Sequence, residues 1–163
     1  QAVAAGGADF VLICTNTMHK VADEVQAAIS IPLVHIADAT AQKLITDGIK
    51  RVGLLGTKFT MQEDFYKNRL TERFGIEVLV PTSTAQDMIH DVIYNQLCLG
   101  VINHQSRQDF ISVINHLYQQ GAEAVILGCT EIALLVEPQH TDVPLYDTTQ
   151  IHAAKAVALA IKG

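Results

Sequence analysis

A buried strand that ends in a glycine and a cysteine constrains the fold of this 163-residue chain more than any other feature. Residues 124–131 read Ala-Val-Ile-Leu-Gly-Cys-Thr-Glu, a continuous apolar run followed by a turn and a helical pattern. Such a run is typical of a parallel strand that is covered on both faces. In open α/β sheets ligands bind at the carboxyl ends of the strands, which is where Cys129 falls.

An earlier stretch has the same construction. Residues 9–17 read Asp-Phe-Val-Leu-Ile-Cys-Thr-Asn-Thr, an apolar strand with a polar tip that leads into a helical pattern. Two similar strand tips in one chain predict a site that is built from two similar halves.

Strand and helix patterns alternate along the whole chain, which predicts an α/β fold with parallel sheets and right-handed crossovers. We expect strands at 9–13, 31–36, 51–56, 77–80, 124–128 and 143–146. Helices are expected at 18–29, 38–47, 61–74, 86–99, 107–120, 130–136 and 149–161, with Asp38 as an N-cap, Gly48 and Gly75 as stops, and a loop at 57–60. Residues 1–7 resemble the last turns of a helix without its N-cap, so we expect a segment upstream of them.

Composition excludes several classes of protein. The net charge is −6 and the basic residues are scattered, whereas a nucleic-acid surface needs a clustered basic face. No apolar run approaches the roughly 18 residues that span a bilayer, and no signal peptide opens the chain. The cysteines are an odd number, 3, and form no CxxC, which favours free thiols and a cytoplasmic location.

The two strand tips carry the candidate chemistry. Cys129 directly precedes a predicted helix, where the helix dipole should lower its thiol pKa, although a cysteine that only fills space in the core is the alternative. The hydroxyls of Thr15, Thr17, Thr57 and Thr60 and the amide of Asn16 suit a small carboxylate, although any single threonine could be a helix cap.

The sequence offers no pattern for a metal or a cofactor. The histidines are dispersed, and only His19, just after the first tip, could contact a ligand. Neither GxGxxG nor GxxxxGK[ST] occurs, and no lysine is set apart for a Schiff base, Lys58 being the nearest candidate. We therefore expect a protein without metal or cofactor.

These residues resemble the aspartate/glutamate racemases, which are cofactor-independent (PLP-independent) amino-acid racemases. The resemblance rests on Ile-Cys-Thr-Asn-Thr-Met-His at 13–19 together with Leu-Gly-Cys-Thr-Glu-Ile at 127–132, and Gly-Leu-Leu-Gly-Thr at 53–57 and Val-Pro-Leu-Tyr-Asp-Thr at 143–148 extend it over nearly the whole chain. It implies two pseudo-symmetric three-layer α/β domains with the substrate in the cleft between them. We expect the first, incomplete domain at 1–36 plus 146–163 and the second at 37–145, an N-terminal segment to be missing, and a homodimer.

The resemblance also implies a mechanism, in which two cysteines on opposite faces of the substrate Cα remove and return a proton. In the family the first cysteine directly precedes Asn-Thr-x-His, and Thr15 holds that place here, with Cys14 one residue early. Side chains alternate along a strand, so Cys14 should point away from the side that Thr15 faces. The expected catalytic pair is therefore Thr15 and Cys129. Because a hydroxyl is a poorer base than a thiolate, and because the second cysteine serves the L-enantiomer in the family, we expect an L-preferring enzyme.

Specificity is expected to be broader than that of a strict aspartate racemase. By the local match, Cys98 takes the place of a lysine that aspartate racemases commonly carry near the distal carboxylate. Glu131 follows the aspartate-type pattern, and it could tune Cys129 or orient Thr130, although its negative charge would by itself raise the pKa of the Cys129 thiol. The expected substrates are L-aspartate and L-glutamate. Two alternatives stay open: a single-cysteine decarboxylase of the same fold, and a carboxylate-binding module without turnover.

Overall fold

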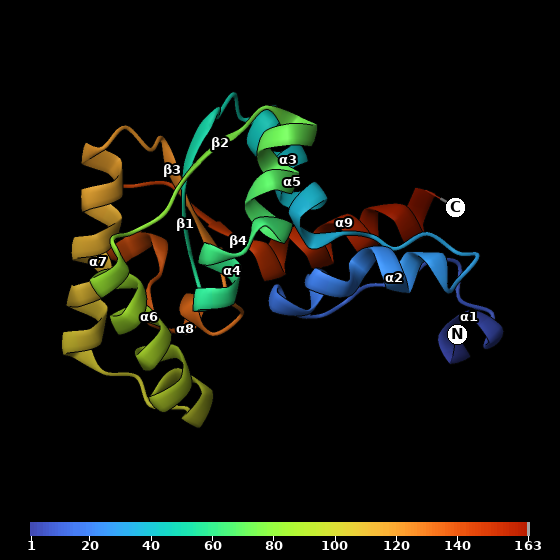
Figure 1. Ribbon diagram of the computed structural model, residues 1–163, viewed down its shortest axis with the longest axis horizontal. Helices are drawn as coiled ribbons and strands as arrows, with labels where there is room; N and C mark the ends of the chain where they lie inside the picture. The colour runs from blue at the N-terminus through green and yellow to red at the C-terminus, as the bar shows by residue number, and fades with distance from the viewer. Residues whose placement is uncertain (163) are drawn as a thin grey trace.

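The sheet of this α/β protein is parallel, as predicted. The computed structural model describes residues 1–162, and its strands are β1 (Arg51–Gly56), β2 (Glu77–Leu79), β3 (Ala124–Gly128) and β4 (Leu145–Asp147). They form one sheet in the order β2-β1-β3-β4, and all three pairings are parallel. The carboxyl ends of β1 and β3 are therefore neighbours at one edge of the sheet (Figure 1).

Two glycines let β1 and β3 approach closely where they end. Gly56 is the register partner of Gly128. A Cβ on Gly128 would lie 2.7 Å from the carbonyl oxygen of Leu55, and one on Gly56 would lie 2.9 Å from that of Gly128. Because backbone atoms cannot move aside as a side chain can, the sequence needs glycine at both places. The tips that follow these strands are thereby brought together.

Helices cover both faces of the sheet (Figure 1). The side chains of Leu55, Val125 and Leu127 enter one core with α6 (Ser83–Asn95), α7 (His104–Gln119) and α8 (Ile132–Leu135). The alternate strand positions, among them Leu54 and Ile126, enter a second core with α3 (Ile36–Thr46) and α5 (Asp64–Phe74). The closing helix α9 (Thr148–Lys162) packs against α3, β3 and β4. Burial on both faces explains the uninterrupted apolar runs of β1 and β3.

The N-terminal segment lies to one side of this sheet (Figure 1). It contains α1 (Ala2–Ala5), the 3-10 helix η1 (Thr17–Val21) and α2 (Ala22–Ala27). The two strands predicted at 9–13 and 31–36 are reduced to one parallel bridge between Val11 and Leu33. A strand forms only where neighbouring strands complete its ladder, and among the described residues these two segments have only each other.

Several helix boundaries also differ from the prediction. His35, and not Asp38, is the N-cap of α3, because its Nδ1 accepts the N–H of Ala37. Asp38 instead forms an ion pair with the Arg69 guanidinium. Most of the expected loop at 57–60 belongs to α4 (Lys58–Gln62), which Thr57 caps. Two further 3-10 turns are η2 (Leu97–Leu99) and η3 (Pro138–His140).

The division into two domains stays a prediction. The expected boundary at 145/146 falls inside β4, which is a strand of the same sheet as β1 and β3. Across residues 1–162, no helix combines the length and the apolar character that crossing a membrane requires.

Candidate active site

A cavity of about 380 Å³ opens where the tips of β1, β3 and the N-terminal segment meet. All three cysteines of the chain line it, together with both predicted strand tips. Its lining residues are Cys14, Thr15, Asn16, Thr17, Met18, Thr57, Ile93, Tyr94, Cys98, Gly128, Cys129, Thr130 and Glu131. The cavity therefore joins residues that are more than a hundred positions apart in the sequence, as the pairing of the two tips predicts.

Cys129 is hydrogen-bonded to Glu131 inside this cavity. The Cys129 thiol donates to Glu131 Oε2 over 3.0 Å, and the Thr130 hydroxyl donates to the same oxygen over 2.6 Å. Burial, followed by the hydrogen bond to Glu131, raises the pKa of the Cys129 thiol to about 12. Burial opposes ionisation of Glu131 as well, but the bonds from Cys129 and Thr130 hold the pKa of this carboxyl below its usual value.

The expected lowering of the Cys129 pKa is wrong in direction. The helix that follows, α8, begins only at Ile132, three residues after Cys129, and has four residues, so its dipole is small and distant from the thiol. Burial of the sulfur and the neighbouring carboxylate outweigh it. Cys129 is consequently a thiol at neutral pH, and it is hydrogen-bonded to the ionised Glu131 carboxylate.

The first tip does not keep the strand alternation that was expected of it. The backbone bends at residues 14–16, directly after the extended segment, and the 3-10 helix η1 begins at Thr17. Alternation of side chains holds only while the backbone is extended. Cys14 and Thr15 both border the cavity as a result, with Cys14 the more exposed of the two.

Asn16 presents a free acceptor at the cavity wall. Its side chain is buried, and its Nδ2 donates to Thr148 Oγ1 over 3.0 Å. The Thr148 hydroxyl in turn donates to the carbonyl oxygen of Leu127 at the end of β3, over 2.9 Å. Among the described residues, Asn16 Oδ1 has no hydrogen-bond partner. A buried amide oxygen in this state can accept a bond from an ammonium group in the cavity.

Three threonine hydroxyls join the first tip to the end of β1. Thr17 Oγ1 lies 3.2 Å from Thr57 Oγ1 and 3.3 Å from Thr60 Oγ1. Thr17 and Thr57 line the cavity, whereas Thr60 is fully buried behind them. Thr57 therefore has two roles, because its side chain caps α4 and the residue also lines the cavity.

Of the remaining residues that the sequence predicted for the site, some line the cavity and one lies behind it. Cys98, Thr130 and Glu131 line the cavity, and His19 does not, because it is buried beneath the first tip. Sequence reasoning missed Met18, Ile93, Tyr94 and Thr148. Thr148 follows β4 as the threonines of the other tips follow their strands, and this position could have identified it. Among the described lining residues Glu131 is the one charged side chain.

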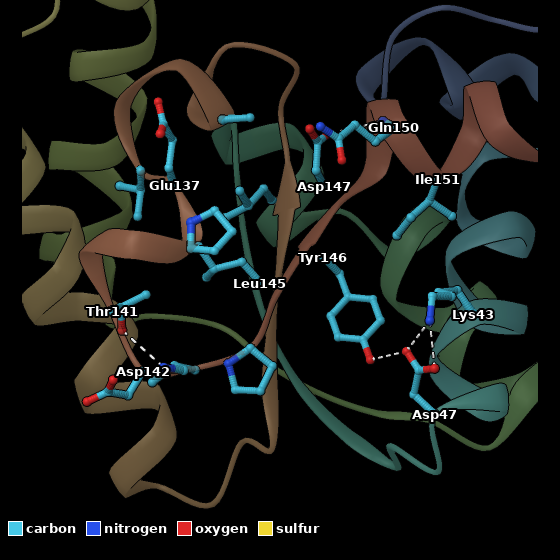
Figure 2. A pocket seen from close by; sticks show the side chains of 16 residues that line it. Lys43, Asp47, Glu137, Thr141, Asp142, Leu145, Tyr146, Asp147, Gln150 and Ile151 are labelled. Atoms are coloured by element: carbon cyan, nitrogen blue, oxygen red, sulfur yellow. Dashed lines mark hydrogen bonds and ion pairs between the residues drawn. The ribbon is translucent and has the colours of Figure 1, made fainter.

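A larger cavity of about 610 Å³ lies beyond β4, and it contains none of the predicted site residues (Figure 2). On one wall the Tyr146 hydroxyl donates to Asp47 Oδ2 over 2.6 Å, and the Lys43 ammonium lies 2.6 Å from Asp47 Oδ1. These three groups satisfy one another. In the part of the chain that the structure describes, no group of three or more His, Cys, Asp or Glu side chains could hold a metal ion. The smaller cavity is therefore the candidate active site.

Comparison with known proteins identifies the family of this chain. The model of the Asp/Glu/Hydantoin racemase family matches residues 1–156. The Broad specificity amino-acid racemase RacX of Bacillus subtilis (strain 168) is 27% identical over 155 residues, which are 93% of this chain and 65% of that protein.

Solved structures show the same fold. A Yersinia pestis protein that is assigned to the Asp/Glu racemases superposes with a TM-score of 0.94 at 49% identity, covering 98% of this chain and 70% of that one. An aspartate racemase homologue from Pyrococcus horikoshii OT3 gives 0.87 at 34% identity, with the same coverage. The chain thus spans about two thirds of the length of these relatives, as 65% and 70% show. With the family model matched over nearly its whole length and the two strand tips gathered around one cavity, the chain belongs to the Asp/Glu/Hydantoin racemase family.

Proposed function

We propose that the protein is an amino-acid racemase that acts on aspartate and glutamate without a cofactor, with a preference for the L-enantiomers. The observation that carries the proposal is the cavity in which the Cys129 thiol, bonded to Glu131, shares one space with the Thr15–Thr17 tip. Racemisation needs an acid and a base on opposite faces of a planar carbanion, held in place before the substrate arrives.

The hydrogen bonds of the cavity suggest how an amino acid would be held. The free Oδ1 of Asn16 suits the α-ammonium group, and the hydroxyls of Thr17 and Thr57 suit the α-carboxylate, while the Thr130 hydroxyl donates to Glu131. These hydroxyls donate hydrogen bonds without placing a second full charge in the cavity. Bound in this way, the Cα–H bond would lie between the two tips.

For an L-substrate, the proton would move in a fixed order. Cys129 first loses its Sγ proton to solvent, because the pKa of Glu131 is too low for this carboxyl to take it from a thiol whose pKa is about 12. The resulting thiolate takes the Cα proton, and the electron pair of the C–H bond passes into the substrate carboxylate. The Thr15 hydroxyl then gives its proton to the opposite face and regains one from solvent. In the reverse direction Thr15 must act as the base, and its poorer basicity is the physical reason for the L-preference.

Exchange of the Cα proton with solvent deuterium tests this function directly. Purified protein is incubated in deuterated buffer with L- and D-aspartate and, separately, with L- and D-glutamate, and exchange is followed by proton NMR. We expect the Cα proton of the L-enantiomers to exchange faster than that of the D-enantiomers. Chiral chromatography should detect the opposite enantiomer, and no CO₂ should be released. Release of CO₂ would favour the decarboxylase, and binding without exchange would favour the binding module.

The role of Glu131 has its own test in the pH dependence of the L-direction rate. The pKa of Cys129 is raised to about 12, and the bond to Glu131 is one cause of that rise, so the thiolate fraction of the wild type should grow about tenfold per pH unit below that value. The Glu131→Gln variant removes the negative charge beside the sulfur, so the thiolate should form at lower pH and the L-direction rate near neutral pH should rise. An unchanged or lower rate in this variant would contradict this role of Glu131. Glu72→Gln on the exposed face of α5 is the matched control.

A further inference from the structure

His19 is buried directly behind the first tip and uses both of its ring nitrogens. Its side chain is 2% exposed and belongs to η1, which follows the tip without a break. Nδ1 lies 2.8 Å from the carbonyl oxygen of Thr15, and Nε2 lies 3.1 Å from the backbone nitrogen of Ile36, the first residue of α3. The imidazole therefore bridges the candidate tip and a helix of the sheet region.

The partners of His19 define its tautomer. The backbone N–H of Ile36 can only donate, so Nε2 must be the acceptor. Nδ1 then carries the ring proton and donates it to the Thr15 carbonyl. An imidazolium ion could not accept the Ile36 bond, and burial, the largest cause, lowers the pKa of His19 to about 4, which keeps the ring neutral.

Two further histidines fix the plane of this ring. The His35 ring centroid lies 4.3 Å from that of His19, and the His152 centroid lies 5.9 Å away. His35 caps α3 through Nδ1, and His152 of α9 donates from Nε2 to the carbonyl oxygen of Val34 over 2.6 Å. The three rings come from three separate elements, so the tip is anchored to α3 and α9 through one cluster.

The backbone of the first tip has few other restraints. Its incoming segment is held by one parallel bridge, in which Val11 donates to the Pro32 carbonyl and accepts from the Val34 N–H. Residues 14–16 lie beyond that bridge and bend away from it. The bond from His19 is the contact that holds the carbonyl of Thr15 itself.

We infer that His19 is a positioning residue, which holds the Thr15 carbonyl and thereby directs the Thr15 hydroxyl into the cavity. It acts through Thr15 and does not touch the substrate, because it does not line the cavity. The inference rests on the proposed function, because its kinetic test measures the proposed racemase activity. A misplacement of the reacting group by about 1 Å can cost as much as about 10²-fold in rate, so one backbone bond at this place matters.

Two substitutions separate the two bonds of His19. In His19→Asn the side-chain amide nitrogen overlies Nδ1, so the bond to Thr15 is kept and the bond to Ile36 is lost. In His19→Gln the amide overlies Nε2, so the bond to Ile36 is kept and the bond to Thr15 is lost. His104→Asn, on the exposed first turn of α7, is the control and should behave as the wild type.

The expected result is a loss of kcat that follows the Thr15 bond. His19→Gln should lower kcat by at least about tenfold with little change in KM, while His19→Asn stays within about threefold of the wild type. Urea unfolding of both variants gives the change in stability. Equal losses of kcat in the two variants, or losses that follow the loss of stability, would overturn the inference.

Nitrogen NMR of the histidine rings in the wild type decides the inference even where a variant does not fold. His19 should carry its proton on Nδ1, and a proton on Nε2 would overturn the proposal. If the wild type exchanges no Cα proton, the proposed function fails by itself. The positioning inference is then decided by the carbonyl-carbon shift of Thr15, which should change in His19→Gln and stay unchanged in His19→Asn.

Discussion

The two strand tips that form the candidate site are similar in sequence and differ in how they are held. Cys129 directly follows Gly128, the last residue of β3, and this strand pairs with a strand on each side and is buried along its whole length. The first tip follows a segment with one parallel bridge, and its side chains hold it in place. These bonds run from Asn16 to Thr148, from Thr17 to Thr57 and Thr60, and from His19 to the Thr15 carbonyl.

Because the two tips are held in place differently, their similar motifs should respond differently to mutation. At the second tip, backbone hydrogen bonds and close packing hold the position, so side-chain substitutions should act on the chemistry of Cys129 and Glu131. At the first tip single side chains hold the position, so substitutions there should act on geometry. Substitutions at the two tips therefore test that contrast.

The largest effect is expected at Cys129. Cys129→Ala removes the thiol that we propose as acid and base, and exchange of the Cα proton of L-aspartate should fall by roughly 10³-fold. Its unfolding midpoint in urea should stay close to that of the wild type, because β3 holds the backbone. Substrate affinity that persists together with undiminished exchange would show that Cys129 is not the catalytic thiol.

The second effect is a fall in the free energy of unfolding in mild acid. It tests the buried histidines that support the first tip. Burial lowers the pKa of His19 to about 4 and that of His35 to about 3, from 6.5 in the unfolded chain. Below 6.5 the unfolded chain therefore binds more protons than the native protein, so the free energy of unfolding falls as the pH falls. For His19 alone the loss should reach about 3 kcal/mol by about pH 4.

Urea unfolding across this range is the measurement, and the onset of the loss identifies its origin. Asp38, whose pKa the Arg69 guanidinium lowers against the effect of burial, would contribute only below its usual value of 3.8. A decline that begins only below about pH 4 would therefore exclude the histidines as its cause. His19→Asn should make the decline shallower, because it removes one of the titrating rings.

Much of the sheet could be predicted from the sequence, and the first tip shows why the rest could not. The bounds of β1 and the stop at Gly75 agree with the prediction, because an apolar run between polar ends and a glycine in the left-handed conformation are local signals. The strand expected at 9–13 had a similar apolar pattern. Whether such a segment becomes a strand depends on partners elsewhere in the chain, which the pattern does not contain.

The candidate site, like the sheet, could be predicted only in part from the sequence. Strand tips could be identified because polar residues after apolar runs are visible in the sequence, and most of those chosen line the cavity. The bond from Asn16 to Thr148 joins residues 132 positions apart, and no spacing rule predicts it. The raised pKa of Cys129 likewise comes from burial, which is a property of the folded molecule.

A smaller effect is expected at Thr148, the far end of the Asn16 bond. Thr148→Val keeps the shape and leaves the Asn16 amide and the Leu127 carbonyl without their partner, which should cost about 2 kcal/mol. Racemisation should slow in both directions, because Asn16 is released. Thr46→Val removes an exposed hydroxyl that donates within α3, and its cost should stay within about 0.5 kcal/mol. Equal losses of unfolding free energy in the two variants would show that Thr148 does not support the first tip.

The smallest effect, and the most specific, is a change in the balance between enantiomers. Thr15→Cys replaces the weak base of the first tip with a thiol, so exchange from D-aspartate should rise and the ratio of L- to D-exchange should narrow by roughly tenfold. Cys14→Ala is the matched control, because Cys14 borders the same cavity one residue away. If Thr15 is the partner of Cys129, this control leaves the ratio unchanged. If Cys14→Ala abolishes exchange from D-aspartate, the thiol at residue 14 serves the second face, and the two tips are then more alike in chemistry than in the way they are held.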